Sequence, residues 1–184
     1  MIIDRQRDKL VEAVIYFAHH TRNLGKIKLF KLLYFLDFAH YRDTGRAVTG
    51  LEYSAWKMGP VPVKLFEELE PQQVDWGASV SFRLKAIAKG SMLTVTAHRQ
   101  FDASLFTKRE LRILEALAAE YKDVRADDMV EATHLENLPW DKVWNQEGRR
   151  QQLIPYTYAL RAQDFEVMRA FADERHEFLD VMSK

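Results

Sequence analysis

The stretch KIKLFKLLYFLDFAHYRDTGRAVTGLEYSAWKMGPVPVKLFEEL, from Lys26 to Leu69, decides the fold of this chain. Its first half carries large side chains at helical spacing on two neighbouring faces, Leu29, Leu32, Leu33 and Leu36 on one and Phe30, Tyr34, Asp37, Phe38 and Tyr41 on the other. A helix with two such faces must be surrounded by other elements, because a face in contact with water would carry polar residues. The pattern therefore predicts a buried central helix. Gly45, which can adopt the left-handed conformation that ends helices, predicts its end at Thr44.

The second half of this stretch predicts extended structure followed by a turn. Residues 48–57 combine threonine, tyrosine and tryptophan around Gly50, a composition typical of strands. The sequence Gly59-Pro60-Val61-Pro62 predicts a stiff turn, because each proline forces the residue before it out of the helical region. Pro62 fits the first turn of a further helix, expected over residues 63–70, where its missing N–H has no cost.

The remaining sequence predicts further helices and one hairpin. Side chains alternate between polar and apolar over residues 80–87 and 92–97, on either side of Lys89-Gly90-Ser91, which predicts a β-hairpin. Its apolar face is expected to pack on the helices or to pair with residues 53–57, and consists of Phe82, Leu84, Leu93 and Val95. Residues 72–79 are expected to form a loop. Capping signals and helical periodicity predict helices over residues 4–20, 107–121, 126–133, 140–146 and 164–182.

These patterns predict a mainly α-helical α+β protein, a compact multi-helix domain around a buried central helix with a small β-hairpin or sheet. The chain has 184 residues, of which 47% are hydrophobic, so it can bury a substantial core. No repeat or low-complexity segment divides it. We therefore expect a single domain over residues 1–184.

Charge and cysteine content narrow the functional classes. Lys+Arg and Asp+Glu both number 27, so the net charge is +0 and no overall positive field favours nucleic acid. The absence of cysteine excludes disulfides, thiolate metal sites and cysteine nucleophiles. The charged N-terminal residues differ from a signal peptide, and no segment is long and apolar enough to cross a bilayer. We expect a cytoplasmic protein.

No sequence pattern nominates a catalytic or cofactor site. The 6 histidines show neither HxxxH nor HExxH spacing, so no metal is expected. Asp37 and His40 lie three residues apart on the central helix and could hydrogen-bond, but no nucleophile accompanies them. We interpret them as a polar pair that satisfies itself at the edge of the core. No glycine motif indicates nucleotide binding, and the prediction is a non-enzymatic protein without a cofactor.

Two lysines stand where they oppose the dipole of the central helix. Lys26 and Lys28 fall in its first turn, whose positive end favours acidic residues instead. They are either solvated or placed to face an acidic partner.

Two blocks of the sequence resemble the Panacea domain, also described as the SocA-like or phage-associated domain of bacterial and phage proteins. The first block contains KLLYF at residues 31–35, the Thr44-Gly45 turn and AWKMGPVP at residues 55–62. The second contains THLENLPW at residues 133–140, followed by Trp144 and by Ile154-Pro155-Tyr156. The resemblance implies a mostly helical antitoxin that binds and neutralises an adjacently encoded toxin. Some members of that family are described instead as adaptors that deliver the toxin to a protease.

Nine residues of these blocks are candidate contacts with a partner protein: Tyr53, Trp56, Lys57, Met58, Pro60, Pro62, His134, Glu136 and Trp140. Two interpretations are open. In the first, the aromatic side chains pack on the central helix and the prolines fix a turn. In the second, a rigid ledge of aromatic and proline residues beside Lys57 forms the hot spot of a protein interface.

The leading hypothesis is an antitoxin that blocks its toxin by direct binding, with residues 80–97 as a candidate determinant of partner choice. One alternative is an adaptor that brings the toxin to a protease unfoldase. Another is a regulator that binds the DNA of its own operon, which the balanced charge disfavours. A hydrolase would require His40 or His134 to meet a carboxylate in an open cavity.

Overall fold

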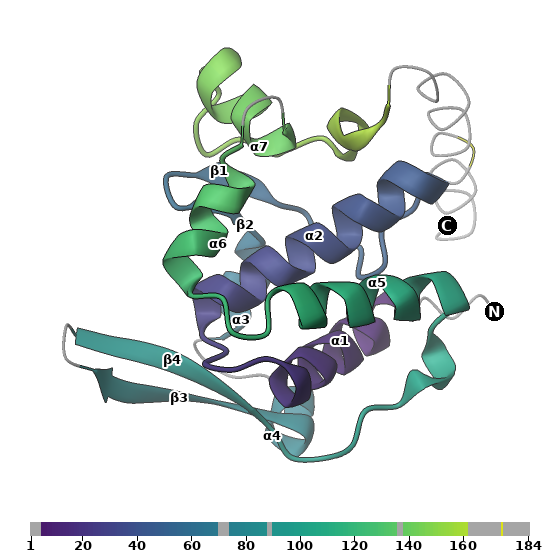
Figure 1. The fold of residues 1–184 in the computed structure, drawn as a ribbon, viewed down its shortest axis with the longest axis vertical. Helices are drawn as coiled ribbons and strands as arrows, with labels where there is room; N and C mark the ends of the chain where they lie inside the picture. Colours follow the sequence, from purple (N-terminus) through teal and green to yellow (C-terminus); the bar gives the residue numbers. More distant parts are fainter. Residues whose placement is uncertain (1–4, 70–73, 88–89, 136–137, 162–173, 175–184) are drawn as a thin grey trace.

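A computed structural model describes residues 5–69, 74–87, 90–135 and 138–161, together with Glu174. Helices make up most of the described chain, and two small antiparallel sheets complete an α+β fold (Figure 1). The helices are α1 (Gln6–His20), α2 (Lys26–Thr44), α3 (Val63–Glu68), α4 (Val74–Ser79), α5 (Lys108–Glu120), α6 (Ala126–Thr133) and α7 (Pro139–Asp141). The strands are β1 (Ser54–Trp56), β2 (Gly59–Val61), β3 (Val80–Ile87) and β4 (Gly90–Ala97), and the short helical turns are η1 (Ala103–Leu105), η2 (Lys142–Gln146) and η3 (Tyr156–Ala159).

The central helix is confirmed. In Figure 1, α2 crosses the middle of the molecule with α1, α5, α6 and the β1–β2 hairpin around it. Leu29, Leu32, Leu33 and Leu36 all have 0% exposure, which makes α2 the centre of the hydrophobic core. The helix ends at Thr44, and Gly45 follows in the left-handed region at φ 68°, as predicted.

Lys28 is buried, so both predicted environments for it are wrong. Its side chain is 1% exposed, and Nζ donates to the carbonyl oxygens of Arg22, Lys122 and Val124 at 3.0, 3.1 and 2.9 Å. The amine thereby ties the start of α2 to the loop that joins α5 to α6. Lys26 lies differently, with Nζ 4.4 Å from the centre of the Phe66 ring.

The hairpin of β3 and β4 is confirmed, but it packs on the helices only in part. Phe82, Leu93 and Val95 contact the core, whereas Leu84 is 70% exposed, so its predicted burial is wrong. The hairpin is longer than the helical surface beside it, and its far part extends beyond α1 and α2 (Figure 1). It does not pair with residues 53–57, because β1 pairs with β2 in a separate sheet.

Residues 74–79, predicted to be part of a loop, form the short helix α4. Trp76 on this helix has 0% exposure, and its ring meets Phe82 edge-on with centroids 5.4 Å apart. The Arg7 guanidinium covers the same indole at 4.9 Å. Burial of one tryptophan against the base of the hairpin therefore organises a segment whose own sequence is weakly helical.

The other predicted helices follow the structure within a few residues where they are described. The predicted helix over residues 164–182 lies outside the described residues, apart from Glu174, as does the predicted start of the first helix at Asp4. In the part of the chain that is described, no helix combines the length and the apolar character needed to cross a membrane.

Candidate functional site

The β1–β2 hairpin carries the first group of predicted contact residues. Lys57 and Met58 form its turn, and both side chains are exposed, Met58 by 48%. Gly59 follows at φ 96°, and a Cβ added here would lie 2.7 Å from both Lys31 Nζ and Thr133 Oγ1. Glycine is therefore needed for the hairpin to approach α2 and α6 this closely.

Lys31 holds β2 on the central helix from inside the core. Its side chain is 1% exposed, and Nζ donates to the Pro60 carbonyl oxygen at 2.8 Å. Burial lowers the pKa of Lys31 from its ordinary 10.5 to about 7, because the charged amine has lost its hydration. The lysine that begins the KLLYF sequence is thus a structural group that recognises a main-chain atom.

The second block of the sequence lies directly on the first. Trp140 donates from Nε1 to the Trp56 carbonyl oxygen at 2.9 Å. The His134 ring stacks on Trp140 with centroids 3.7 Å apart and planes 10° apart, and Trp144 stacks on Trp140 at 5.5 Å. Two segments some eighty residues apart therefore form one continuous structure at the end of the β1–β2 hairpin.

The last part of the second block packs on the central helix as well. The Tyr156 ring stacks on Phe38 and Tyr41 with centroids 4.5 and 5.0 Å away. Its hydroxyl donates to the Leu51 carbonyl oxygen, which lies in the segment before β1. Tyr156 therefore joins the segment after η2 to both α2 and the approach to the hairpin.

His134 contributes an aromatic surface more than a polar one. Its Nε2 is buried and has no hydrogen-bond partner among the described residues. Burial lowers the pKa of His134, the nearby charge of Lys31 lowers it further, and Asp141 opposes both effects. The neutral imidazole stacked on Trp140 is consequently favoured near neutral pH.

The nine predicted contact residues differ in how much surface they present. Lys57 and Met58 are exposed and Trp56 and His134 are half-buried, while the buried members are Tyr53, Pro60, Pro62 and Trp140. Glu136 lies outside the described residues. Of the buried members, Tyr53 and Pro60 are hydrogen-bonded to α2 and Trp140 to the hairpin. Lys57 and Met58, flanked by Trp56 and His134, therefore remain the predicted contact positions.

Two exposed leucines beside this hairpin escaped the sequence analysis. Leu135, 60% exposed, directly follows His134, and Leu153, 51% exposed, forms an antiparallel bridge with Ser54. Their sequence signal was weak, because Leu135 stands among polar residues and Leu153 precedes Ile154, both outside any predicted helix or strand. We call Trp56, Met58, Leu135 and Leu153 the β1–β2 surface.

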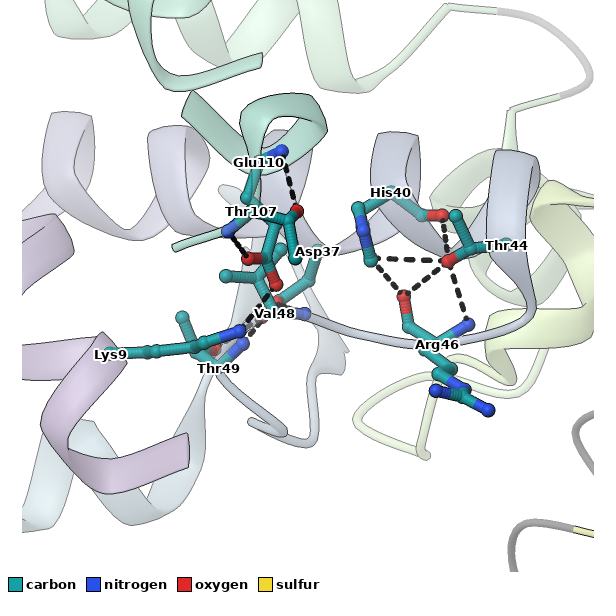
Figure 2. A network of polar contacts seen from close by, with 9 residues as sticks. All are labelled: Lys9, Asp37, His40, Thr44, Arg46, Val48, Thr49, Thr107 and Glu110. Atoms are coloured by element: carbon teal, nitrogen blue, oxygen red, sulfur yellow. Dashed lines mark hydrogen bonds and ion pairs between the residues drawn. The ribbon is translucent and has the colours of Figure 1, made fainter. Parts of the chain in front are cut away.

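Besides the β1–β2 surface, the domain has a polar centre in its interior, where Asp37 anchors the chain between α2 and β1 (Figure 2). Asp37 is 0% exposed, and its Oδ1 accepts from the backbone N–H groups of Val48 and Thr49 at 2.8 and 2.7 Å. Its Oδ2 accepts from the hydroxyls of Thr49 and Tyr53 at 2.5 and 2.7 Å. Burial raises the pKa of Asp37 from 3.8 to about 6, and these four hydrogen bonds oppose the rise.

The predicted pairing of Asp37 with His40 is wrong, and the two side chains serve separate segments (Figure 2). His40 Nδ1 lies 2.7 Å from the Arg46 carbonyl oxygen and 3.2 Å from Thr44 Oγ1. Asp37 is directed instead at the next stretch of the same loop, residues 48 and 49. Together they bind the loop after α2 back onto the helix at two points.

The polar centre also includes a contact that joins α1 to α5. Thr107 and Glu110 form the predicted capping box at the start of α5, and Lys9 of α1 donates to Glu110 at 2.6 Å. Burial would raise the pKa of Glu110, but the hydrogen bonds from Lys9 and from the Thr107 N–H outweigh it and keep that pKa below its ordinary value. Every group in Figure 2 has a structural partner, an arrangement suited to holding segments in place.

The described residues also give no cation site. Within the segments that the structure places, no three histidine, aspartate or glutamate side chains gather so that they could hold a metal ion.

Comparison with known families identifies the class of protein that this arrangement defines. The chain belongs to the family described as antitoxin SocA-like, Panacea domain, whose model matches residues 29–141. The match begins in α2 and ends in α7, so it covers the first block and residues 133–140 of the second. No curated protein and no solved structure matches the chain.

Proposed function

We propose that this protein is a non-enzymatic antitoxin that neutralises an adjacently encoded toxin by binding it directly. The observation that carries the proposal is the family match over residues 29–141, since antitoxin is the role by which that family is described. The same match implies a toxin as the partner in general. We place the complex in the cytoplasm, where a toxin that acts inside the cell has to be blocked.

The β1–β2 surface supports direct binding as the mechanism. It combines a rigid aromatic base with protruding apolar side chains, because Trp56 is held by Phe66 at 5.4 Å and by the Trp140 hydrogen bond while Met58 stands at the turn. Rigid aromatic anchors with apolar neighbours are the usual high-energy positions of protein interfaces. An interface of roughly 1,200–2,000 Å² built around it would block the toxin sterically.

Co-expression tests the proposal. The neighbouring reading frame is induced in a test bacterium with and without this protein, growth is followed, and the two chains are co-purified. Rescue of growth together with a stable complex is the expected result. A harmless neighbour, or toxicity that this protein leaves unchanged, would contradict the antitoxin role.

Surface variants locate the contact. Met58→Asp places a charge in the β1–β2 surface at an exposed turn, and we expect it to reduce the recovered toxin at least tenfold while the melting temperature stays unchanged. Lys108→Glu, at the exposed start of α5, is the matched control and should bind as the wild type does. Neutralisation that disappears in a strain without its protease unfoldase would favour the adaptor mechanism over direct blocking.

A further inference from the structure

Strand β3 is an exposed sheet edge eight residues long. Within the described residues its only strand partner is β4, and the two strands are in register from Val80 opposite Ala97 to Ile87 opposite Gly90. The opposite edge of β4 is occupied, because the Val95 N–H donates to the Leu24 carbonyl oxygen at 3.0 Å and Thr94 forms a bridge with Gly25. The hairpin therefore has one covered edge and one open edge.

The direction of the Val95 N–H determines which backbone groups of β3 face outward. In an antiparallel pair, opposite residues both point their N–H and C=O groups toward the partner strand or both point them away. Val95 points away from β3 and lies opposite Phe82, so the outward-facing residues of β3 begin with Val80 and continue with the three residues Phe82, Leu84 and Ala86. None of these three makes a backbone hydrogen bond to another element within the described residues. They form a row of unpaired donors and acceptors, which is the usual template for addition of a strand.

Leu84 stands at the middle of this row and is 70% exposed. Arg83 and Lys85, its neighbours, are exposed as well and form no ion pair with any described residue. Residues 80–98 contain three basic side chains, Arg83, Lys85 and Lys89, and no acidic one, although the whole chain has a net charge of +0. The open edge therefore combines one apolar side chain with an uncompensated positive charge.

The positive charge of Arg83 and Lys85 indicates whether the open edge of β3 pairs with a second copy of the chain or with a different protein. If two copies paired antiparallel about Leu84, Arg83 of one would stand opposite Lys85 of the other at both positions, and like charges directly opposite are destabilising. A strand with acidic residues at those positions would instead gain two favourable cross-strand pairs. The edge is thus protected against self-pairing and suited to an acidic partner.

We propose that the open edge of β3 receives an extended segment of the toxin, which adds as a third strand and places acidic side chains beside Arg83 and Lys85 and an apolar side chain beside Leu84. The inference rests on the proposed antitoxin function and assigns it a second contact, separate from the β1–β2 surface. Main-chain pairing supplies a contact that tolerates many toxin sequences, while the basic and apolar side chains select among them.

Leu84→Pro is the main test, because it removes an outward-facing N–H and leaves every β3–β4 hydrogen bond in place. The toxin encoded by the neighbouring reading frame serves as the probe, in the co-purification described above. We expect at least a tenfold loss of recovered toxin for Leu84→Pro and a loss below threefold for Leu84→Ala, which keeps the N–H. Hydrogen exchange of residues 81–87 should also slow at least tenfold in the wild-type complex.

The double variant Arg83→Glu/Lys85→Glu tests the role of the positive charge and leaves the backbone of the strand unchanged. It therefore tests the inference even if the proline of Leu84→Pro disturbs the hairpin. It should lose at least tenfold in recovered toxin, whereas Lys108→Glu should lose nothing. If both hairpin variants bind the toxin as well as the wild type does, this inference is overturned and the antitoxin role stands. Failure of the wild-type chain to bind the toxin overturns both the β3 contact and the antitoxin role, whereas a double variant whose only defect is weaker binding to operator DNA overturns the β3 contact alone.

Discussion

The carboxylate of Asp37 provides the sharpest test of how this domain is held together. It is a charge with 0% exposure, and its partners are two backbone N–H groups and two hydroxyls, none of them a cation. Two substitutions separate the charge from the hydrogen bonds. Asp37→Asn removes the charge but keeps an oxygen for the two N–H groups, and both hydroxyls can rotate to accept from the new amide. Asp37→Leu keeps the number and branching of the side-chain heavy atoms and removes all four interactions.

The pH dependence follows from the raised pKa. In the unfolded chain Asp37 loses its proton near 3.8, and in the folded protein near 6, so between these values the folded state binds more protons. The contribution of this group to the free energy of unfolding therefore falls as the pH rises through that window, and the full penalty is present above about 6. A shift of two pKa units corresponds to about 3 kcal/mol.

The assay is urea denaturation at a series of pH values from 4 to 7. We expect the Asn variant to gain stability relative to the wild type by about 2–3 kcal/mol between pH 4 and pH 7, because it lacks the penalty. Asp8→Asn, at an exposed position of α1, controls for loss of a carboxylate and should show no such gain. A difference between Asn variant and wild type that stays constant with pH would refute the account of Asp37 as a buried charge.

The Leu variant measures the hydrogen bonds themselves. It leaves the N–H groups of Val48 and Thr49 buried without partners, and each such group costs about 1–3 kcal/mol. We expect Asp37→Leu to be less stable than Asp37→Asn by about 4 kcal/mol at pH 7. Equal stability of the two variants would show that the loop after α2 does not depend on this anchor.

Three further predictions concern the core. Lys31→Met should remove a second pH dependence, of opposite sign to that of Asp37. The pKa of Lys31 in the folded protein, about 7, lies below the ordinary 10.5, so the wild type gains stability as the pH rises between these values and the variant does not. Denaturation at pH 7 and pH 10 would reveal the difference. Trp140→Phe keeps the stacked ring but leaves the Trp56 carbonyl without its donor, so the free energy of unfolding should fall by about 1–3 kcal/mol, and an unchanged value would contradict a structural role for this contact. Leu33→Asp should unfold or aggregate the protein, because it buries an unpaired carboxylate at a position with 0% exposure, and an unchanged melting temperature would remove α2 from the core.

The features that could be predicted from sequence are those written in local patterns. The end of α2 at Thr44 follows from Gly45, the capping box of α5 follows from Thr107 and Glu110, and the β3–β4 hairpin follows from alternation around Gly90. Each of these depends on residues within a few positions of one another. Secondary structure of this kind is indicated by residues that are close together in the sequence, so a single sequence is enough to find it.

The features that escaped prediction depend on partners far along the chain. Lys28 is placed by carbonyl groups at residues 122 and 124, some ninety positions away, and no local pattern indicates them. α4 exists because Trp76 is buried against Phe82, although the residues around it have weak helix propensity. The exposure of Leu84 also depends on distant segments. Alternation shows which face of a strand is apolar, but it does not show how far the supporting helices extend along that face.

The candidate site was predicted unevenly for a related reason. The sequence located the two blocks correctly, and the structure brings them together through Trp56, His134 and Trp140. It could not separate the buried residues of those blocks from the exposed ones, because an aromatic residue is favoured both in a core and at an interface. Lys57 and Met58 differ from their buried neighbours only in standing at the turn, which is a property of the three-dimensional arrangement.

One principle connects the buried polar groups of α2 to the proposed function. Lys28, Lys31, Asp37 and His40 all project from this helix, and each is hydrogen-bonded to main-chain atoms of another segment. Such contacts are indifferent to the side chains of the segments they hold, because every residue offers the same carbonyl and, proline excepted, the same N–H. The loops and hairpins around α2 can therefore change their exposed side chains without losing their anchors. A domain built in this way can keep one fold while Met58, Leu84 and their exposed neighbours are altered, so we expect the choice of toxin to reside in those side chains and the stability of the domain to reside in α2.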